Sequence, residues 1–140
     1  MLVRYPKLAR AGAIIPQMTL NNDLAPTILD IAGVEPPKGM LMQGASWKPL
    51  LEGKPGNWRA SWFYEYFFEP SFAATPSMQG VRTEKWKYVR YPDIRDREEL
   101  YDLQNDPAEM KNLAGDKRAN AQLETMRTEL YRLVKETIGG

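Results

Sequence analysis

Residues Gly80 to Leu113 read GVRTEKWKYVRYPDIRDREELYDLQNDPAEMKNL. Valine, tryptophan and tyrosine are concentrated between Val81 and Tyr91, a composition typical of strands that pack on at least one face. The polar segment Thr83–Lys85 divides this run and predicts a hairpin turn. After a charged loop, apolar and polar residues alternate from Glu99 to Leu103, which predicts a third short strand.

A capped helical turn is predicted directly after this third strand. Asp106 is a residue type that caps helices, and Pro107 suits the first helical position. Glu109 stands where the partner of a capping box belongs. The stretch therefore predicts strand, turn, strand, loop, strand and capped turn.

Two flanking segments complete this predicted domain. Ser61 to Phe68 carries aromatic residues on both faces, which predicts a central strand buried on both sides. From Lys117 to Ile138, apolar residues recur at steps of three and four, which predicts a helix that covers the sheet and ends at Gly139 and Gly140. The predicted fold class is α+β, a small antiparallel sheet of about four strands packed on a C-terminal helix.

The first third of the chain predicts a strand and a helix. Leu2–Tyr5 is a short apolar run ended by a proline, and a strand there must join a sheet because its backbone groups need partners. Asn22 to Gly33 predicts a helix, capped by Asn22 or Asp23 and closed by Gly33 in the left-handed conformation.

The side chains of this helix suggest what surrounds it. Leu24, Ile28 and Ile31 share one face, at a spacing suited to packing against a sheet. Asp23 and Asp30 lie two turns apart, too distant to share a metal ion without other ligands, and we interpret them as one cap and one solvated residue. A second short helical turn is predicted at Trp47–Leu51.

Composition excludes several classes of function. Nineteen basic and eighteen acidic residues leave a net charge of +1, which argues against a surface for nucleic acid or anionic membranes. No apolar run approaches the roughly 20 residues of a membrane span. The chain has no cysteine and no histidine, so it lacks a thiolate nucleophile, a disulfide and the commonest general base. The sequence predicts neither a nucleic-acid partner nor a membrane partner.

Four blocks of the sequence resemble one known family. Gly80–Tyr91 and Glu99–Ala114 resemble the C-terminal region of sulfatases of the alkaline-phosphatase-like superfamily, of the arylsulfatase and choline-sulfatase type. Asp23–Val34 (DLAPTILDIAGV) and Met42–Gly53 (MQGASWKPLLEG) precede them in the order that the family shows. The resemblance implies that residues 1–56 form the C-terminal end of the sulfatase catalytic α/β domain, and that residues 57–140 form its C-terminal subdomain.

The same resemblance implies chemistry that this chain cannot supply. A sulfatase of this family needs a formylglycine made from Cys or Ser in a Cys/Ser-x-Pro-x-Arg motif, and a divalent cation, usually calcium, held by Asp and Asn residues. The chain has no cysteine, and none of its four serines begins such a motif. No Asp-x-x-Asn or Asp-Asp grouping resembles the metal loop of the family. We therefore expect no catalytic residue, metal ligand or cofactor in this chain. The parent enzyme would need both a formylglycine and a divalent cation.

Candidate substrate-binding residues are Glu65, Gln79 and Arg82. Glu65 is a carboxylate in an aromatic strand, and it is either a substrate contact at the rim of a cleft or the partner of a nearby Arg or Lys. The loop Pro70–Gln79 lies, in the enzymes it resembles, near the mouth of the active site. Some members have a histidine there, whereas this chain has Ser77, Met78 and Gln79.

Arg82 is the best candidate for an oxyanion contact in the basic stretch Arg82–Arg97, because an Arg fork fits such groups through two hydrogen bonds. Acidic residues alternate with the basic ones along this stretch, so a solvated mixed-charge surface is the ordinary interpretation. The sequence alone does not decide between an oxyanion contact at Arg82 and a solvated surface.

Three hypotheses of function follow. The first is a C-terminal fragment of a sulfatase, a sulfuric ester hydrolase, that packs against the catalytic domain, walls one side of its cleft and is inactive alone. The alternative is a standalone binding module for sulfated glycans or a protein partner through the Arg82–Arg97 face. The third is a structural role at an oligomer interface. The expected partner is the missing catalytic domain, or a second copy through the Leu2–Tyr5 strand. Such sulfatases are often periplasmic, extracellular or lysosomal, and this chain carries no signal that chooses among them.

Overall fold

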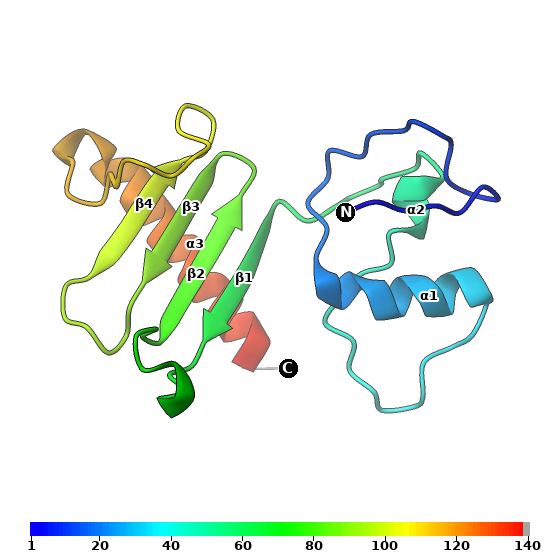
Figure 1. Cartoon of the computed structure of the whole chain (residues 1–140), viewed down its shortest axis with the longest axis horizontal. Coiled ribbons are helices and arrows are strands. Elements are labelled where there is room, and N and C mark those ends of the chain that lie inside the picture. The colour runs from blue at the N-terminus through cyan, green and yellow to red at the C-terminus, as the bar shows by residue number, and fades with distance from the viewer. Residues whose placement is uncertain (139–140) are drawn as a thin grey trace. The chain divides into compact units, whose positions relative to one another are not determined.

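The computed structural model describes residues 1–138 and divides into two compact units, Met1–Arg59 and the chain from Ala60 onward (Figure 1). The second unit is a single antiparallel sheet with one long helix across it. The first unit consists of short helices joined by extended loops. Within the described residues, no helix is long and apolar enough to cross a membrane.

The sheet of the second unit has four strands in the order β1-β2-β3-β4, each antiparallel to its neighbour. The strands are β1 (Ser61–Tyr66), β2 (Met78–Thr83), β3 (Trp86–Arg90) and β4 (Glu98–Asp102). The predicted hairpin between β2 and β3 forms without an Asn-Gly turn, because the hydroxyl of Thr83 accepts a hydrogen bond of 3.0 Å from the Trp86 amide. The four-stranded α+β prediction is confirmed.

Helix α3 (Asn120–Ile138) packs across the sheet, after a 3-10 turn over Lys117–Ala119 that begins at Asp116. The core between them contains the buried residues Val81, Tyr88, Leu100, Leu123, Met126 and Leu130. The apolar spacing predicted this arrangement correctly. The predicted end at Gly139 and Gly140 lies outside the described residues.

Two predictions for this unit are wrong. The aromatic strand β1 lies at an edge of the sheet, and it ends at Tyr66, so that Phe67 and Phe68 are 69% and 50% exposed. No helix forms after Asp106, whose carboxylate accepts from the amides of Met110 and Lys111 at 3.0 and 2.8 Å. Glu109 has a positive φ of 56°, whereas a helix needs the right-handed αR conformation at this position. The chain therefore forms a turn here.

The first unit contains a 3-10 turn (Asn21–Asp23), α1 (Leu24–Ala32) and α2 (Lys48–Leu51). Gly33 ends α1 at φ 68°, as predicted, and its amide bonds the Asp30 carbonyl at 3.2 Å. The predicted strand Leu2–Tyr5 does not form, because residues 1–59 contain no strand with which its backbone could pair. The predicted apolar face of α1 is present but uncovered, since Leu24 and Ile28 are 47% and 58% exposed.

Candidate functional site

A row of polar side chains crosses the sheet on the side of α3. The register places Glu65 opposite Gln79, and Gln79 opposite Arg90. The Nε2 group of Gln79 donates to Glu65 Oε2 at 3.2 Å, and its Oε1 accepts from Nε and Nη2 of Arg90 at 2.9 and 2.5 Å. Because one end of the amide donates and the other accepts, its orientation is fixed. The structure thus brings together two of the three predicted residues.

Helix α3 contributes the fourth member of this row. Arg90 Nη1 donates to the hydroxyl of Tyr131 at 3.1 Å, and its guanidinium carbon lies 5.0 Å from the centre of the Tyr131 ring. Stacking on an aromatic ring holds a guanidinium in one orientation. No pattern in the sequence identifies Tyr131 as a partner of Arg90, because helical periodicity identifies only the buried side of α3.

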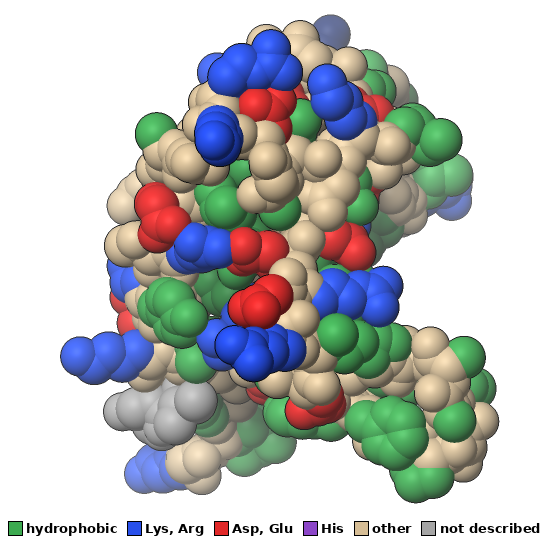
Figure 2. Space-filling view, turned by 90° about the vertical axis from the view of Figure 1, so that its left-hand side faces the viewer, with side chains coloured by type: hydrophobic (Ala, Val, Ile, Leu, Met, Phe, Trp, Pro, Cys, Tyr) green, Lys and Arg blue, Asp and Glu red, His purple; other side chains and the backbone are tan. Residues whose placement is uncertain are grey.

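Arg82, the third predicted residue, lies apart from this row. It is exposed and pairs in register with Trp62 and Lys87. Because side chains alternate along a strand, Arg82 is on the opposite face of the sheet from Gln79 and Arg90. The basic residues from Arg82 to Arg97 therefore do not share one surface. Figure 2 shows basic and acidic side chains interspersed on the face in view.

Glu65 also differs from its expected environment. It is exposed, and its hydrogen bond is to an amide, whereas an ion pair with Arg82, Lys87 or Arg90 was the expected alternative to a substrate contact. No ion pair of Glu65 is found among residues 1–138. One carboxylate oxygen is thus left for a hydroxyl or amino group of another molecule.

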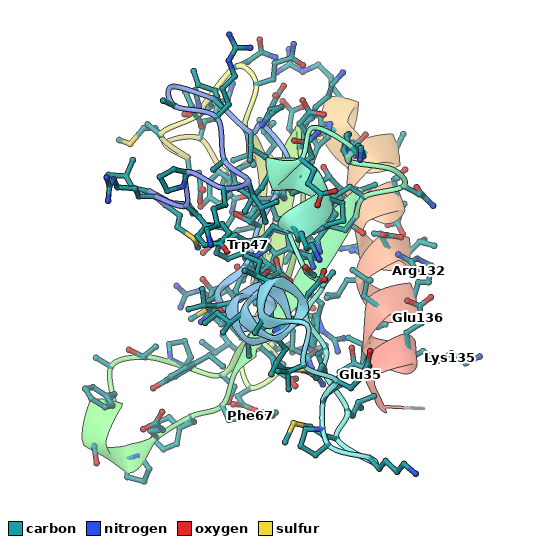
Figure 3. All side chains as sticks on the ribbon, turned by 90° about the vertical axis from the view of Figure 1, so that its right-hand side faces the viewer. Glu35, Trp47, Phe67, Arg132, Lys135 and Glu136 are labelled. Carbon is teal, nitrogen blue, oxygen red and sulfur yellow. The ribbon has the colours of Figure 1, made fainter. Side chains whose placement is uncertain are left out.

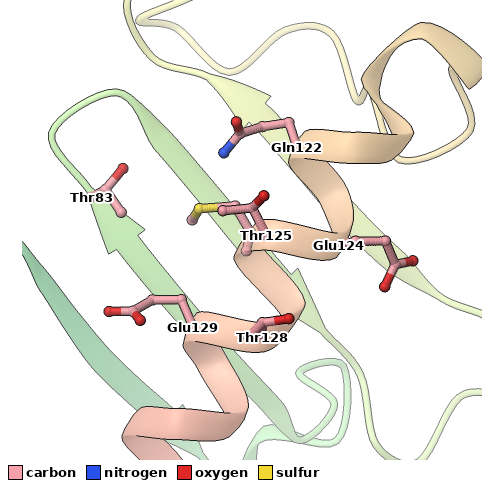
Figure 4. A pocket seen from close by; sticks show the side chains of 7 residues that line it. Thr83, Gln122, Glu124, Thr125, Thr128 and Glu129 are labelled. Atoms are coloured by element: carbon pink, nitrogen blue, oxygen red, sulfur yellow. The ribbon is translucent and has the colours of Figure 1, made fainter.

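A groove of about 560 Å³ lies between the end of β2 and the first half of α3 (Figure 4). It is lined by Thr83, Gln122, Glu124, Thr125, Met126, Thr128 and Glu129. The carboxylate of Glu129 accepts from Arg132 at 2.8 and 2.7 Å and also bonds the Ser61 hydroxyl. Chiefly because of Arg132, the pKa of Glu129 is lowered, so this carboxylate is a poor base. Figure 3 shows Arg132 on the outer side of α3.

The first unit is held together by a buried ion pair. Asp23 is fully buried and accepts two bonds from Arg59, at 2.5 and 2.6 Å. The amides of Leu20 and Ala45 donate to the same carboxylate at 2.7 and 2.8 Å. Burial alone would raise the pKa of Asp23, but these hydrogen bonds outweigh it and hold the pKa below its usual value.

This clamp corrects the interpretation of Asp23, which precedes α1, and of Asp30, which lies within it. Asp23 does not cap α1 with its side chain, and Asp30 is not simply solvated, because it bonds Lys48 at 2.8 Å and Ser46 at 2.7 Å. Gly44 is required beside the clamp, since a Cβ there would lie 2.1 Å from the Asn22 carbonyl oxygen. Both aspartates are therefore structural.

The described residues do not fit the cofactors that the resemblance implies for the parent. Among residues 1–138, no group of three or more His, Cys, Asp or Glu side chains could hold a metal ion. The sequence contains no formylglycine motif. The geometry supports binding and orientation of polar groups by the Glu65–Gln79–Arg90–Tyr131 row.

Comparison with known proteins gives one consistent result. The model of the family "N-sulphoglucosamine sulphohydrolase, C-terminal" matches residues 1–136. An N-acetylglucosamine-6-O-sulfatase of Bacteroides thetaiotaomicron is 37% identical over 140 residues, which cover 98% of this chain and 24% of that protein. Arylsulfatase K of Homo sapiens is 33% identical over 112 residues, which cover 75% of this chain and 20% of that protein.

Solved structures share the fold. One, a protein in complex with its substrate D-glucosamine-2-N,6-O-disulfate, matches with a TM-score of 0.84 at 34% identity, over 95% of this chain and 27% of that chain. A phosphonate monoester hydrolase of Agrobacterium radiobacter matches with a TM-score of 0.72 at 27% identity, over 86% of this chain and 25% of that chain. The chain thus spans about a quarter of the length of these relatives.

Proposed function

The chain belongs to the N-sulphoglucosamine sulphohydrolase C-terminal family, the C-terminal region of alkaline-phosphatase-like sulfatases, and on that premise we propose that it is the C-terminal part of a sulfuric ester hydrolase for a sulfated amino sugar. The observation that carries this proposal is the match over residues 1–136. The substrate class is inferred from the N-acetylglucosamine-6-O-sulfatase and from the relative bound to a glucosamine disulfate.

Within that enzyme, residues 1–56 would complete the catalytic α/β domain and residues 57–140 would form the small subdomain. Support comes from α1, whose exposed Leu24 and Ile28 have no cover within residues 1–59. Apolar faces of this kind mark contacts with other parts of a protein. The preceding three quarters of a sulfatase would supply that cover.

The Glu65–Gln79 pair is the part of this chain that we propose to face the substrate. Glu65 can accept from a sugar hydroxyl, and the fixed amide of Gln79 holds Glu65 in place. Arg90 and Tyr131 act here as positioning residues, since they fix the amide. Arg82 is not included because it lies on the other face of the sheet.

The reaction itself would belong to the preceding part of the enzyme. Formylglycine would supply the nucleophile there, and a divalent cation such as calcium would neutralise charge on the sulfate group. The residues of this chain would bind and orient the sugar and exclude water from one side of the cleft. The chain alone is therefore inactive in this proposal.

The test compares the chain alone with the same chain joined to the preceding three quarters of the Bacteroides relative, and measures sulfate released from glucosamine 6-sulfate. We expect turnover only from the joined protein. In that protein, Glu65→Gln should raise KM several-fold, whereas Arg132→Gln, an exposed change on α3, should leave it unchanged. Hydrolysis by the chain alone, or none by the joined protein, would overturn the proposal.

A further inference from the structure

The two edge strands of the sheet, β4 and β1, differ in how their outer backbone groups are bonded (Figure 1). In an antiparallel sheet, successive residues of a strand point their N–H and C=O groups alternately toward one neighbouring strand and toward the other. An edge strand therefore presents every second residue to whatever lies beyond the sheet. The partners of these outer groups show which edge is closed.

The outer edge of β4 is closed by the segment that follows it. The Leu100 amide donates to the side-chain oxygen of Asn112 at 3.0 Å, and the Leu100 carbonyl accepts from the Leu113 amide at 2.8 Å. Two residues earlier, the Glu98 carbonyl accepts from Nδ2 of Asn112 at 3.0 Å. A further strand could pair with this edge only by displacing Asn112 and Leu113.

The same bonds fix which residues of β1 point outward. Leu100 points away from β3 and lies opposite Tyr88, so Tyr88 bonds to β2 rather than to β4. Its partner on β2, Val81, therefore bonds to β3 and points its backbone groups away from β1. Phe63 lies opposite Val81, so its N–H and C=O point out of the sheet, as do those of the residues two before and two after it.

The outer edge of β1 is open. No backbone or side-chain group of residues 1–138 bonds the outward N–H and C=O groups of Ser61, Phe63 and Glu65. The register with β2 runs from Ser61 to Tyr66 without a bulge, and β1 contains no proline and no lysine. Sheets commonly protect an open edge with exactly such features, so their absence identifies β1 as an edge suited to pairing.

We propose that β1 pairs with β1 of a second copy of this chain, antiparallel to it and related to it by a two-fold axis at Phe63. A second copy supplies the same open edge with the same spacing of donors and acceptors. In this register Ser61 lies opposite Glu65 of the second copy, and the outward groups form about six hydrogen bonds. The two sheets then become one, with both copies of α3 on the same side.

The side chains of β1 are compatible with this register. Glu65 is the one charged residue of the strand, and it meets a serine rather than its own copy, so no like charges are opposed. On the other face, Trp62 meets Tyr64 of the second copy as an aromatic cross-strand pair. The dimer does not rest on the proposed sulfatase function. It also differs from the self-association expected through Leu2–Tyr5, because that segment forms no strand.

The first measurement is the mass of the isolated chain by sedimentation equilibrium, from about 10 μM to about 1 mM. One pair of strands is a small interface, so we expect a reversible dimer that dissociates within this range. Amide hydrogen exchange then locates the contact. The amides of Phe63 and Glu65 should exchange more slowly as the concentration rises, whereas those of Trp62 and Tyr64, which bond to β2, should be protected at every concentration.

Ser61→Pro tests the backbone pairing directly, because proline has no N–H and is tolerated at the first position of an edge strand. Ser61→Ala is the matched control, since it also loses the hydroxyl that bonds Glu129 but keeps the N–H. We expect Ser61→Pro to raise the Kd of the dimer about tenfold, and Ser61→Ala to change it less than about twofold. An equal loss from both variants would contradict pairing through the backbone.

Two results from the unmodified chain would overturn the proposal whether or not Ser61→Pro folds. One is a chain that stays monomeric at about 1 mM. The other is a dimer in which exchange at Phe63 and Glu65 does not slow with concentration, since another surface would then form the contact. Slower exchange in Leu2–Tyr5 instead would assign the contact to that segment. None of these measurements depends on sulfate release, so they remain decisive if the sulfatase proposal fails.

Discussion

Helices α1 and α3 have opposite arrangements of polar and apolar residues. In α3, Leu123, Met126 and Leu130 are buried, while Arg132 on the exposed side bonds Glu129 and Glu136 (Figure 3). This is the ordinary arrangement for a helix that covers a core and faces water. The unit from Ala60 onward therefore contains its own core.

In α1 the polar side is inside. Asp23, which begins it, and Thr27 are buried, whereas Leu24 and Ile28 are exposed. The one charged residue within α1, Asp30, is bonded to Lys48 at 2.8 Å. The exposed side of α1 therefore carries apolar residues and no free charge, which is the pattern that our proposal explains by contact with the catalytic domain. The difference teaches that the second unit buries its own apolar residues, whereas the first is held by polar clamps and leaves the apolar side of α1 exposed.

The largest effect should come from the polar clamp. Arg59→Met leaves the carboxylate of Asp23 buried without its cation, at a cost of about 3–5 kcal/mol in the free energy of unfolding. We expect residues 1–59 to lose their native amide chemical shifts while β1–β4 and α3 keep theirs. Arg118→Met removes an exposed pair with Asp116 and is the control. If Arg59→Met unfolded both units together, their independence would be disproved.

The second largest effect on stability should come from the core of the unit from Ala60 onward. Leu130 is fully buried between α3 and the sheet, so Leu130→Ala should lower the free energy of unfolding by about 2–5 kcal/mol. Thr128→Ala, at an exposed position of the same helix, should have little effect. Urea unfolding followed by circular dichroism measures both variants. A loss below about 1 kcal/mol for Leu130→Ala would mean that the core is loosely packed.

These two sites also show what the sequence could reveal. The Leu130 position was predictable because the apolar period of α3 and the alternation in β2 and β3 are local patterns. The Asp23–Arg59 pair was not, because its members are 36 residues apart and no local pattern links them. Local patterns also could not show that the Leu2–Tyr5 strand does not form, since a strand forms only where another strand is present to pair with it. The sequence identified Glu65 and Gln79 as candidates but did not show that they pair. The contact of Tyr131 was not predictable, because it depends on how α3 crosses the sheet.

Acid should destabilise the unit Met1–Arg59, by less than the loss of Arg59 does. The pKa of Asp23 in the folded state is held below its ordinary value of 3.8, so its contribution to stability is fully present above pH 3.8. That contribution is lost as the pH falls through the lowered pKa, because a proton then binds the unfolded chain more tightly. Amide shifts of residues 1–59 should report this loss. Asp23→Asn should reduce the pH dependence and leave the part that comes from Asp30, whose pKa is lowered by hydrogen bonds from Lys48 and Ser46. Unchanged pH dependence in that variant would assign the effect to another group.

The smallest effect in the isolated chain should come from the exposed face of α1. Ile28 is 58% exposed, so Ile28→Lys should change the free energy of unfolding by less than about 0.5 kcal/mol. When the chain is joined to the preceding part of the relative, the same change should cost about 1.5–3 kcal/mol, the value of a buried aliphatic side chain. Thermal unfolding of both forms measures the difference. Arg132→Ala on α3, which breaks exposed ion pairs, should cost about the same small amount in both forms. An equal effect of Ile28→Lys in the two forms would mean that α1 faces water in the whole enzyme as well, and that its inverted polarity serves some purpose other than a contact.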